Sequence, residues 1–178
     1  MAPIVSPEQA NEWFIGKART LEGIRENIVH STERATSHAA LGRMYFFRYD
    51  PKFKEVLPIY DRFPLVLPIE RYKGGFLGLN IHYLDYPQNK GFRKKLLDQL
   101  KENATNLKYD ETTRVKMSYT ILKSMTMMKL AKPTIHRYLM NHVRSRFIEI
   151  HMDEWDKVAV LKVQDFVTKK KKNKTHGN

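Results

Sequence analysis

The sequence predicts an α+β fold, in which a small antiparallel sheet or partial barrel packs against several helices. Residues 44–84 combine aromatic and β-branched residues with Pro and Gly turns, which is typical of short strands. The segments on either side carry apolar residues at intervals of three and four, which is typical of amphipathic helices. With 178 residues, 42% of them hydrophobic, the chain can bury one compact core with modest appendages.

A long N-terminal helix is expected from residue 6 to about residue 35. Ser6 can cap its first turn, Pro7 suits the first helical position, and the charge of Glu8 favours the positive end of the helix dipole. Phe14 and Leu21 then recur at helical spacing. Residues 1–40 are therefore predicted to form a helical arm that can dock onto a partner protein or a second copy.

Strands and turns are expected next. Residues 44–49, 65–70 and 76–84 are predicted strands, and Lys73-Gly74-Gly75 is a tight turn that makes the last two a hairpin. Their aromatic side chains alternate with arginines, so they can either form the core or stack on nucleic-acid bases. We expect at least half of these rings to be core, and the set is Tyr45, Phe47, Tyr49, Tyr60, Tyr72 and Tyr83.

The remaining elements are mostly helical. Helices are predicted at residues 88–103, 115–131 and 133–146, and returning strands at residues 147–151 and 158–163. Together with the strand region they form a predicted core domain of residues 41–167. Residues 168–178 follow as a polybasic tail, which mutual repulsion of its lysines should keep disordered.

Positive charge is the strongest functional signal. The chain has 32 Lys and Arg residues against 19 Asp and Glu residues, a formal net charge of +13. The tail holds five of the lysines, so the rest of the chain is basic without it. Such an excess attracts phosphate polymers and predicts a nucleic-acid partner, with DNA favoured. Solubility alone is the alternative explanation.

The predicted helix from Pro133 is the best candidate binding face, because Arg137, Asn141 and Arg144 fall on one side of a helical wheel. A second basic cluster begins the helix after Gly91, where a bound anion would offset the helix dipole. The predicted nucleic-acid-binding residues are Arg93, Lys94, Lys95, Lys132, Arg137, Asn141, Arg144, Arg146, Lys169, Lys170, Lys171, Lys172 and Lys174.

No catalytic motif accompanies this charge. The chain lacks cysteine, a nucleophile elbow, a phosphate-binding loop and any recognised metal-binding spacing of its seven histidines. The sequence therefore predicts a protein that is not an enzyme and needs no cofactor or metal. A metal-dependent nuclease is a lesser alternative, which would require its carboxylates to cluster in space. The candidate ligands are Asp50, Glu55, Asp61 and Glu70.

No apolar run approaches the roughly 20 residues of a membrane span, and the N-terminus has no secretory signal pattern. The absence of cysteine fits a reducing compartment. We therefore expect a protein that is intracellular or is carried in an intracellularly assembled particle, neither secreted nor membrane-bound.

About residues 44–166 resemble a family of small basic proteins of large contractile-tailed phages, including those of marine cyanobacteria. The resemblance is carried by Phe47–Lys52, Leu57–Pro68, Glu70–Tyr72, Gly75–Leu84, Lys132–Tyr138, Val143–Phe147 and Glu154–Trp155. It implies a viral setting, with the protein in the host cytoplasm or in a virion, and transfers no catalytic residue.

The leading hypothesis is a non-enzymatic, nucleic-acid-binding phage protein that contacts the phosphate backbone in genome packaging, protection or virion assembly. A structural virion protein of the capsid, neck or tail, held by contacts of the N-terminal helix with other virion proteins, is the alternative.

Overall fold

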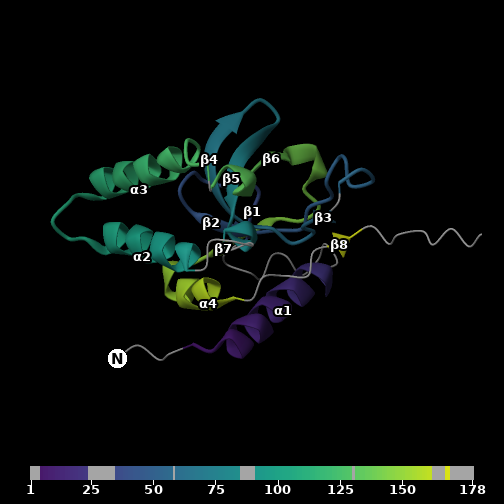
Figure 1. The fold of residues 1–178 in the computed structure, drawn as a ribbon, viewed down its shortest axis with the longest axis horizontal. Helices are drawn as coiled ribbons and strands as arrows, with labels where there is room; N and C mark the ends of the chain where they lie inside the picture. The colour runs from purple at the N-terminus through teal and green to yellow at the C-terminus, as the bar shows by residue number, and fades with distance from the viewer. Residues whose placement is uncertain are drawn as a thin grey trace, which may run out of the picture.

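The computed structural model describes residues 5–23, 35–57, 59–84, 91–129, 131–161 and 167–168 (Figure 1). In the described residues, five strands follow the first helix, two helices come next, and strands and a short helix complete the fold, with short 3₁₀ turns (η) between some of them. In order, the elements are α1 (Pro7–Gly23), β1 (Ala35–Thr36), β2 (Met44–Phe46), β3 (Ile59–Tyr60), β4 (Leu65–Tyr72), β5 (Gly75–Asn80), η2 (Ile81–Tyr83), α2 (Phe92–Thr105), α3 (Glu111–Met125), η3 (Lys132–Thr134), β6 (Ile135–Leu139), η4 (Met140–His142), β7 (Phe147–Ile150), η5 (Met152–Glu154), α4 (Trp155–Val160) and β8 (Val167–Thr168).

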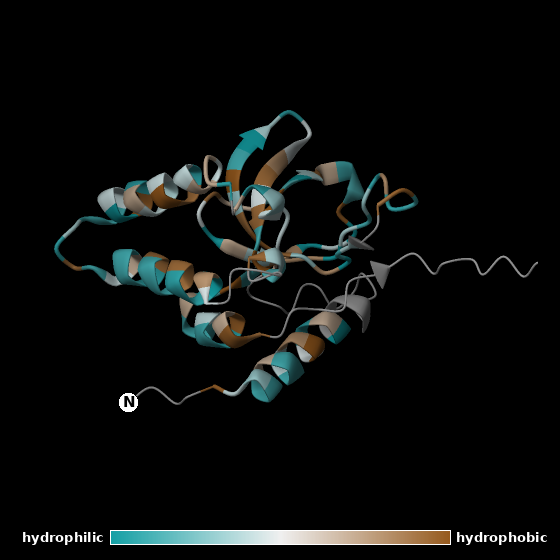
Figure 2. Ribbon diagram, in the orientation of Figure 1, coloured by the Kyte–Doolittle hydropathy of each residue, from teal (hydrophilic) through white to brown (hydrophobic). Residues whose placement is uncertain are grey.

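A six-stranded antiparallel sheet is the framework of the described residues, with strand order β1-β7-β2-β4-β5-β6. Its longest pairing is the β4–β5 hairpin, whose turn at Lys73-Gly74 places Gly74 at a positive φ of 86°. Hydrophilic residues occupy the tip of this hairpin and hydrophobic ones its base (Figure 2). A second, two-stranded ladder pairs β3 with β8.

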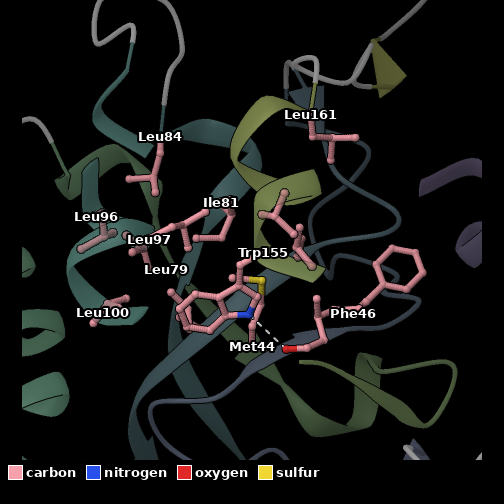
Figure 3. Close-up of a cluster of buried hydrophobic side chains, with 14 of the residues drawn as sticks. Met44, Phe46, Leu79, Ile81, Leu84, Leu96, Leu97, Leu100, Trp155 and Leu161 are labelled. Carbon is pink, nitrogen blue, oxygen red and sulfur yellow. Dashed lines mark hydrogen bonds between the residues drawn. The ribbon is translucent and has the colours of Figure 1, made fainter. Parts of the chain in front are cut away.

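The helices cover one face of the sheet, and the main hydrophobic core lies between them (Figures 1 and 3). Leu96, Leu97 and Leu100 of α2 share this core with Met44 and Leu79 from the strands. Close packing of such side chains is the main source of stability in a domain of this size. The indole Nε1 of Trp155 lies in the same cluster and donates a hydrogen bond to the Ile150 carbonyl over 3.1 Å, so its one polar atom is satisfied.

The opposite face of the sheet carries a cluster of aromatic rings. Phe47 lies 4.8 Å from Phe147 of β7 and 5.5 Å from Tyr138 of β6, measured between ring centroids. Because β6 and β7 lie near opposite edges of the strand order, the sheet must curl for both rings to meet Phe47. Phe76 of β5 stacks on Tyr138 at 5.3 Å and completes the concave side.

The predicted α+β class is confirmed, and so are the N-terminal helix, the β4–β5 hairpin, the two helices that became α2 and α3, and the strand at β7. Among the aromatic candidates, Tyr45, Phe47 and Tyr49 are core residues, whereas Tyr60, Tyr72 and Tyr83 are partly exposed.

Two predicted elements were wrong. Residues 133–146 do not form a helix: after the η3 turn, β6 pairs with β5, and then η4 follows. The edge of β5 offers hydrogen bonds to this segment, and Tyr138 fits the aromatic cluster, so pairing outweighs the helical spacing. Residues 158–163 were predicted as a strand, but helix α4 continues to Val160, because Val158 and Leu161 both face the core at helical spacing.

Helix α1 packs on the rest of the molecule over its described residues. Ala10 and Phe14 are buried in the main core, and Trp13 Nε1 donates to Glu154 Oε1 over 3.1 Å. The apolar side that we expected to dock onto a partner is therefore occupied within the chain. Two parts of the chain on which predictions were made lie outside the described residues, namely residues 24–34 of the predicted arm and the tail lysines within residues 169–178. The division of the chain at residues 40 and 167 stays a prediction.

Gly78 of β5 is a position where the strands approach too closely for a side chain. A Cβ atom there would overlap Val66 and press on the Tyr138 ring, whereas a Cβ at Gly16 in α1 would have no neighbour within 4 Å. We expect Gly78→Ala to lower the free energy of unfolding by about 1–3 kcal/mol. The matched change Gly16→Ala should raise it by up to about 1 kcal/mol. Urea denaturation followed by circular dichroism measures both, and equal stability of the two variants would contradict this packing.

Candidate nucleic-acid interface

The structure places five of the predicted binding residues along one stretch of chain, from η3 through β6 and η4 to the start of β7. Lys132, Arg137, Asn141, Arg144 and Arg146 are all exposed. Arg137 lies over the Tyr72 ring, with its guanidinium carbon 4.1 Å from the ring centroid. They are therefore presented by an edge strand and the turns that follow it, and not by a helical face.

The predicted cluster at the start of α2 does not form a free anion site. Arg93 is buried, and its guanidinium donates a hydrogen bond to the Leu161 carbonyl at the end of α4. Lys94 is paired with Asp98 at 2.5 Å, and only Lys95 of the three is exposed without a carboxylate partner among the described residues. Arg93 is better understood as a link between α2 and α4, so we leave it out of the interface proposed below.

The stretch from Arg137 to Arg146 lies beside a second basic stretch, residues 48–62. The Arg144 amide donates to the Arg48 carbonyl over 2.8 Å, the Asp50 amide donates to the His142 carbonyl over 3.0 Å, and Tyr49 bridges to Val143. We call segments 48–62 and 137–146 together the basic edge. They contain seven cations and three carboxylates. The cations are Arg48, Lys52, Lys54, Arg62, Arg137, Arg144 and Arg146.

The carboxylates of the basic edge neutralise few of these cations. Asp50 accepts from Lys54 at 2.8 Å and lies 3.7 Å from Arg144, and Asp61 is turned inward. Within the described part of the chain, no carboxylate partner is found for Arg48, Lys52, Arg62, Arg137 or Arg146. Elsewhere Lys17, Arg43, Lys94, Lys101 and Lys123 each pair with a carboxylate. In the helical layer, by which we mean residues 92–129, Lys108, Lys116 and Lys129 are also exposed without a carboxylate partner. Among the described residues, most exposed arginines without a carboxylate partner lie at the basic edge, and the others are Arg19 and Arg71.

A cavity of about 460 Å³ opens within the basic edge. Its volume lies in the range of small-molecule sites. Aromatic rings from the loop before β4 and from β6 form much of its wall. The lining residues are Tyr49, Pro51, Lys52, Phe53, Leu57, Tyr60, Asp61, Asn80, Tyr83, His136, Arg137, Tyr138 and Leu139.

A buried polar network holds the inner side of this cavity in place. Asp61 Oδ2 accepts hydrogen bonds from His82 Nδ1 at 2.7 Å and Asn80 Nδ2 at 3.1 Å, and Asp61 Oδ1 accepts from the Phe63 amide at 3.0 Å. Burial of Asp61 alone would raise the pKa of its carboxyl, but the charge of His82 and these hydrogen bonds outweigh burial and hold the pKa below its usual value. Asp61 is therefore ionised at neutral pH, although its side chain is only 10% exposed.

A family model for the phage T4 terminal DNA protecting protein matches residues 4–177, which is nearly the whole chain. The chain belongs to this family. The predicted resemblance to proteins of contractile-tailed phages is thereby confirmed. Searches of curated proteins and of solved structures found no match to the chain.

Two further observations concern membrane-spanning helices and potential metal ligands. None of the helices in the described residues is long and apolar enough to cross a membrane. Of the four carboxylates considered for a nuclease, three have other partners: Asp50 pairs with Lys54, Glu70 pairs with Lys123 and Asp61 is buried against His82. The described residues contain no group of three or more potential metal ligands.

The sequence did not reveal the Asp61 network or the cavity. Asp61 and His82 are 21 residues apart, a separation at which no helical or strand periodicity brings two side chains together. The available local signal was Asn80, whose side chain caps the η2 turn by accepting from the His82 amide.

Asp61→Asn should lower the free energy of unfolding by about 3 kcal/mol at pH 7, because it removes the charge of one partner of a buried, hydrogen-bonded pair. The folded carboxyl has a pKa below that of the unfolded chain, about 3.9, so its contribution is present above that pH and is lost as the pH falls. Urea denaturation between pH 3 and pH 7 should show a smaller acid destabilisation in the variant than in the wild type.

The matched control is Asp98→Asn, which removes an exposed carboxylate paired with Lys94 and should cost less than about 1 kcal/mol. If Asp61→Asn costs no more than Asp98→Asn, the network around Asp61 does not stabilise this region.

Proposed function

We propose that this protein binds the ends of phage DNA through the basic edge and shields them, acting by binding rather than by catalysis. The observation that carries the proposal is the concentration of exposed arginines without carboxylate partners on two adjoining segments, 48–62 and 137–146. Arginine presents a planar fork of donors that matches a phosphate group, and each neutralised phosphate releases counterions.

Family membership supports the choice of DNA ends over other polyanions. The family is described by terminal DNA protection, and its model spans residues 4–177 of this chain. A protein bound over the last base pairs would cover the terminus that an exonuclease must engage. Roles in packaging or virion assembly would use the same contact with the phosphate backbone.

The lysine tail can add to the same surface. It follows directly on β8, whose Val167 pairs with Tyr60 beside the cavity. The first of its five lysines, Lys169, directly follows Thr168, the last residue of β8. They would contribute attraction that is independent of DNA sequence and is weakened by salt.

The charge of the basic edge is tested by the triple variant Arg48→Gln/Arg144→Gln/Arg146→Gln. We expect its affinity for a linear duplex to fall by about tenfold or more at 0.1 M salt, with a shallower salt dependence, because phosphate contacts are lost. The control Lys108→Gln/Lys116→Gln/Lys129→Gln removes the same charge from the helical layer and should lose much less.

The same proteins are then compared for protection of end-labelled linear DNA from an exonuclease. The wild type and the helical-layer control should slow degradation, and the basic-edge variant should not. Equal loss of binding in the two triple variants would show that only total charge matters, and a wild type that leaves ends unprotected would refute the proposed function.

A further inference from the structure

We propose that the cavity of the basic edge receives an unpaired nucleobase at the DNA terminus. This inference rests on the proposed function, and it adds the part of the DNA end that the protein recognises. Phosphate contacts alone do not distinguish the end of a duplex from its interior, because they carry no information about the bases. A pocket that accepts a base can distinguish them, since bases are free to leave the stack most readily at an end.

The walls of the cavity have the chemistry that a base requires. Tyr49 and Tyr138 are buried at its inner side, Tyr60 and Tyr83 are partly exposed, and Phe53 is 61% exposed. Aromatic faces stack on any of the four bases, and enzymes that extrude a base hold it between aromatic or apolar side chains.

The cavity wall also includes hydrogen-bond acceptors. Asp61 lines it with a carboxylate, and His136, another lining residue, has its Nε2 buried without a hydrogen-bond partner among the described residues. Burial lowers the pKa of His136, and its ring also makes a hydrogen bond to the Pro133 backbone, so a neutral ring with Nε2 as an acceptor is favoured. The negative charge of Asp61 would repel a phosphate group. An N–H group of a base would satisfy His136 Nε2.

The cations stand at the rim. Lys52 Nζ lies 5.3 Å from the centroid of the Phe53 ring, and Arg137 is held over Tyr72. The neighbouring phosphates of an inserted nucleotide would therefore meet positive charge outside the cavity while the base meets acceptors inside it. This division of charge fits a nucleotide of a DNA chain and does not fit an inorganic anion.

The test uses hairpin duplexes with a single open end, which is blunt, carries a short 3′ overhang or carries a short 5′ overhang. Each overhang is also made with abasic nucleotides, which keep the phosphates and remove the bases. We expect the full-length wild type to bind one of the overhangs at least about fivefold more tightly than the blunt end, and the abasic form to lose this preference.

Phe53→Ala should bring the overhang-to-blunt affinity ratio close to one, and His136→Phe, which keeps a ring but removes the acceptor, should lower it. Leu107→Ala removes another exposed apolar side chain, on the α2–α3 connection, and should keep the wild-type ratio. Circular dichroism confirms that each variant is folded.

A wild type that binds overhangs, abasic overhangs and blunt ends equally would overturn the base pocket and leave the proposed function intact. Retention of the preference in folded Phe53→Ala and His136→Phe would also overturn it. Displacement of the overhang by a free mononucleotide at lower concentration than by the overhang itself would assign the cavity to a soluble nucleotide instead. Failure of the wild type to bind any of the duplexes would reject the proposed function itself.

Discussion

A buried carboxylate ties segment 48–62 of the basic edge to the end of β5 and to η2. Asp61 belongs to the long connection between β2 and β4, and its partners Asn80 and His82 lie at the end of β5 and in η2. A buried charge is tolerated only when its hydrogen bonds are complete, so the geometry around Asp61 permits little variation. Its neighbours Tyr60 and Arg62 are thereby placed, the first lining the cavity and the second exposed beside it.

The curled sheet supplies the other half of the interface. Successive residues of β6 point to opposite faces, so Tyr138 enters the aromatic cluster while Arg137 is exposed. The hydroxyl of Tyr72 donates to the Tyr138 carbonyl over 3.0 Å, and the Tyr72 ring supports the Arg137 guanidinium. The Leu139 amide donates to the hydroxyl of Tyr49 over 3.1 Å, which joins the end of β6 to the neighbouring loop. These contacts hold the backbone of β6 and the Arg137 side chain that it carries in place.

Much of this fold could be predicted from local patterns, because α2, α3 and the β4–β5 hairpin each have strong periodicity or a definite turn. The segment 133–146 could not, since residues such as Ile135 and Leu139 fit a helical spacing as well as a strand. Its exposed residues Arg137, Asn141 and Arg144 were nevertheless identified, because polar side chains are exposed at these positions in either structure. Arg93 was predicted to be exposed but is buried. Its guanidinium contacts the Leu161 carbonyl because α4 packs against α2, and no local pattern in the sequence shows this packing. A contact between distant segments, such as that of Asp61 with His82, leaves no periodic pattern in the sequence from which it could be predicted.

We propose that DNA meets the basic edge and not the helical layer, although both are positively charged. Hydrogen–deuterium exchange of the protein, measured with and without a linear duplex, distinguishes the two surfaces. Slower exchange on DNA binding should appear in residues 48–62 and 137–146, with residues 94–129 unchanged. Slower exchange confined to the helices at 94–129, with no change at the basic edge, would place the DNA on the opposite layer and contradict the claim.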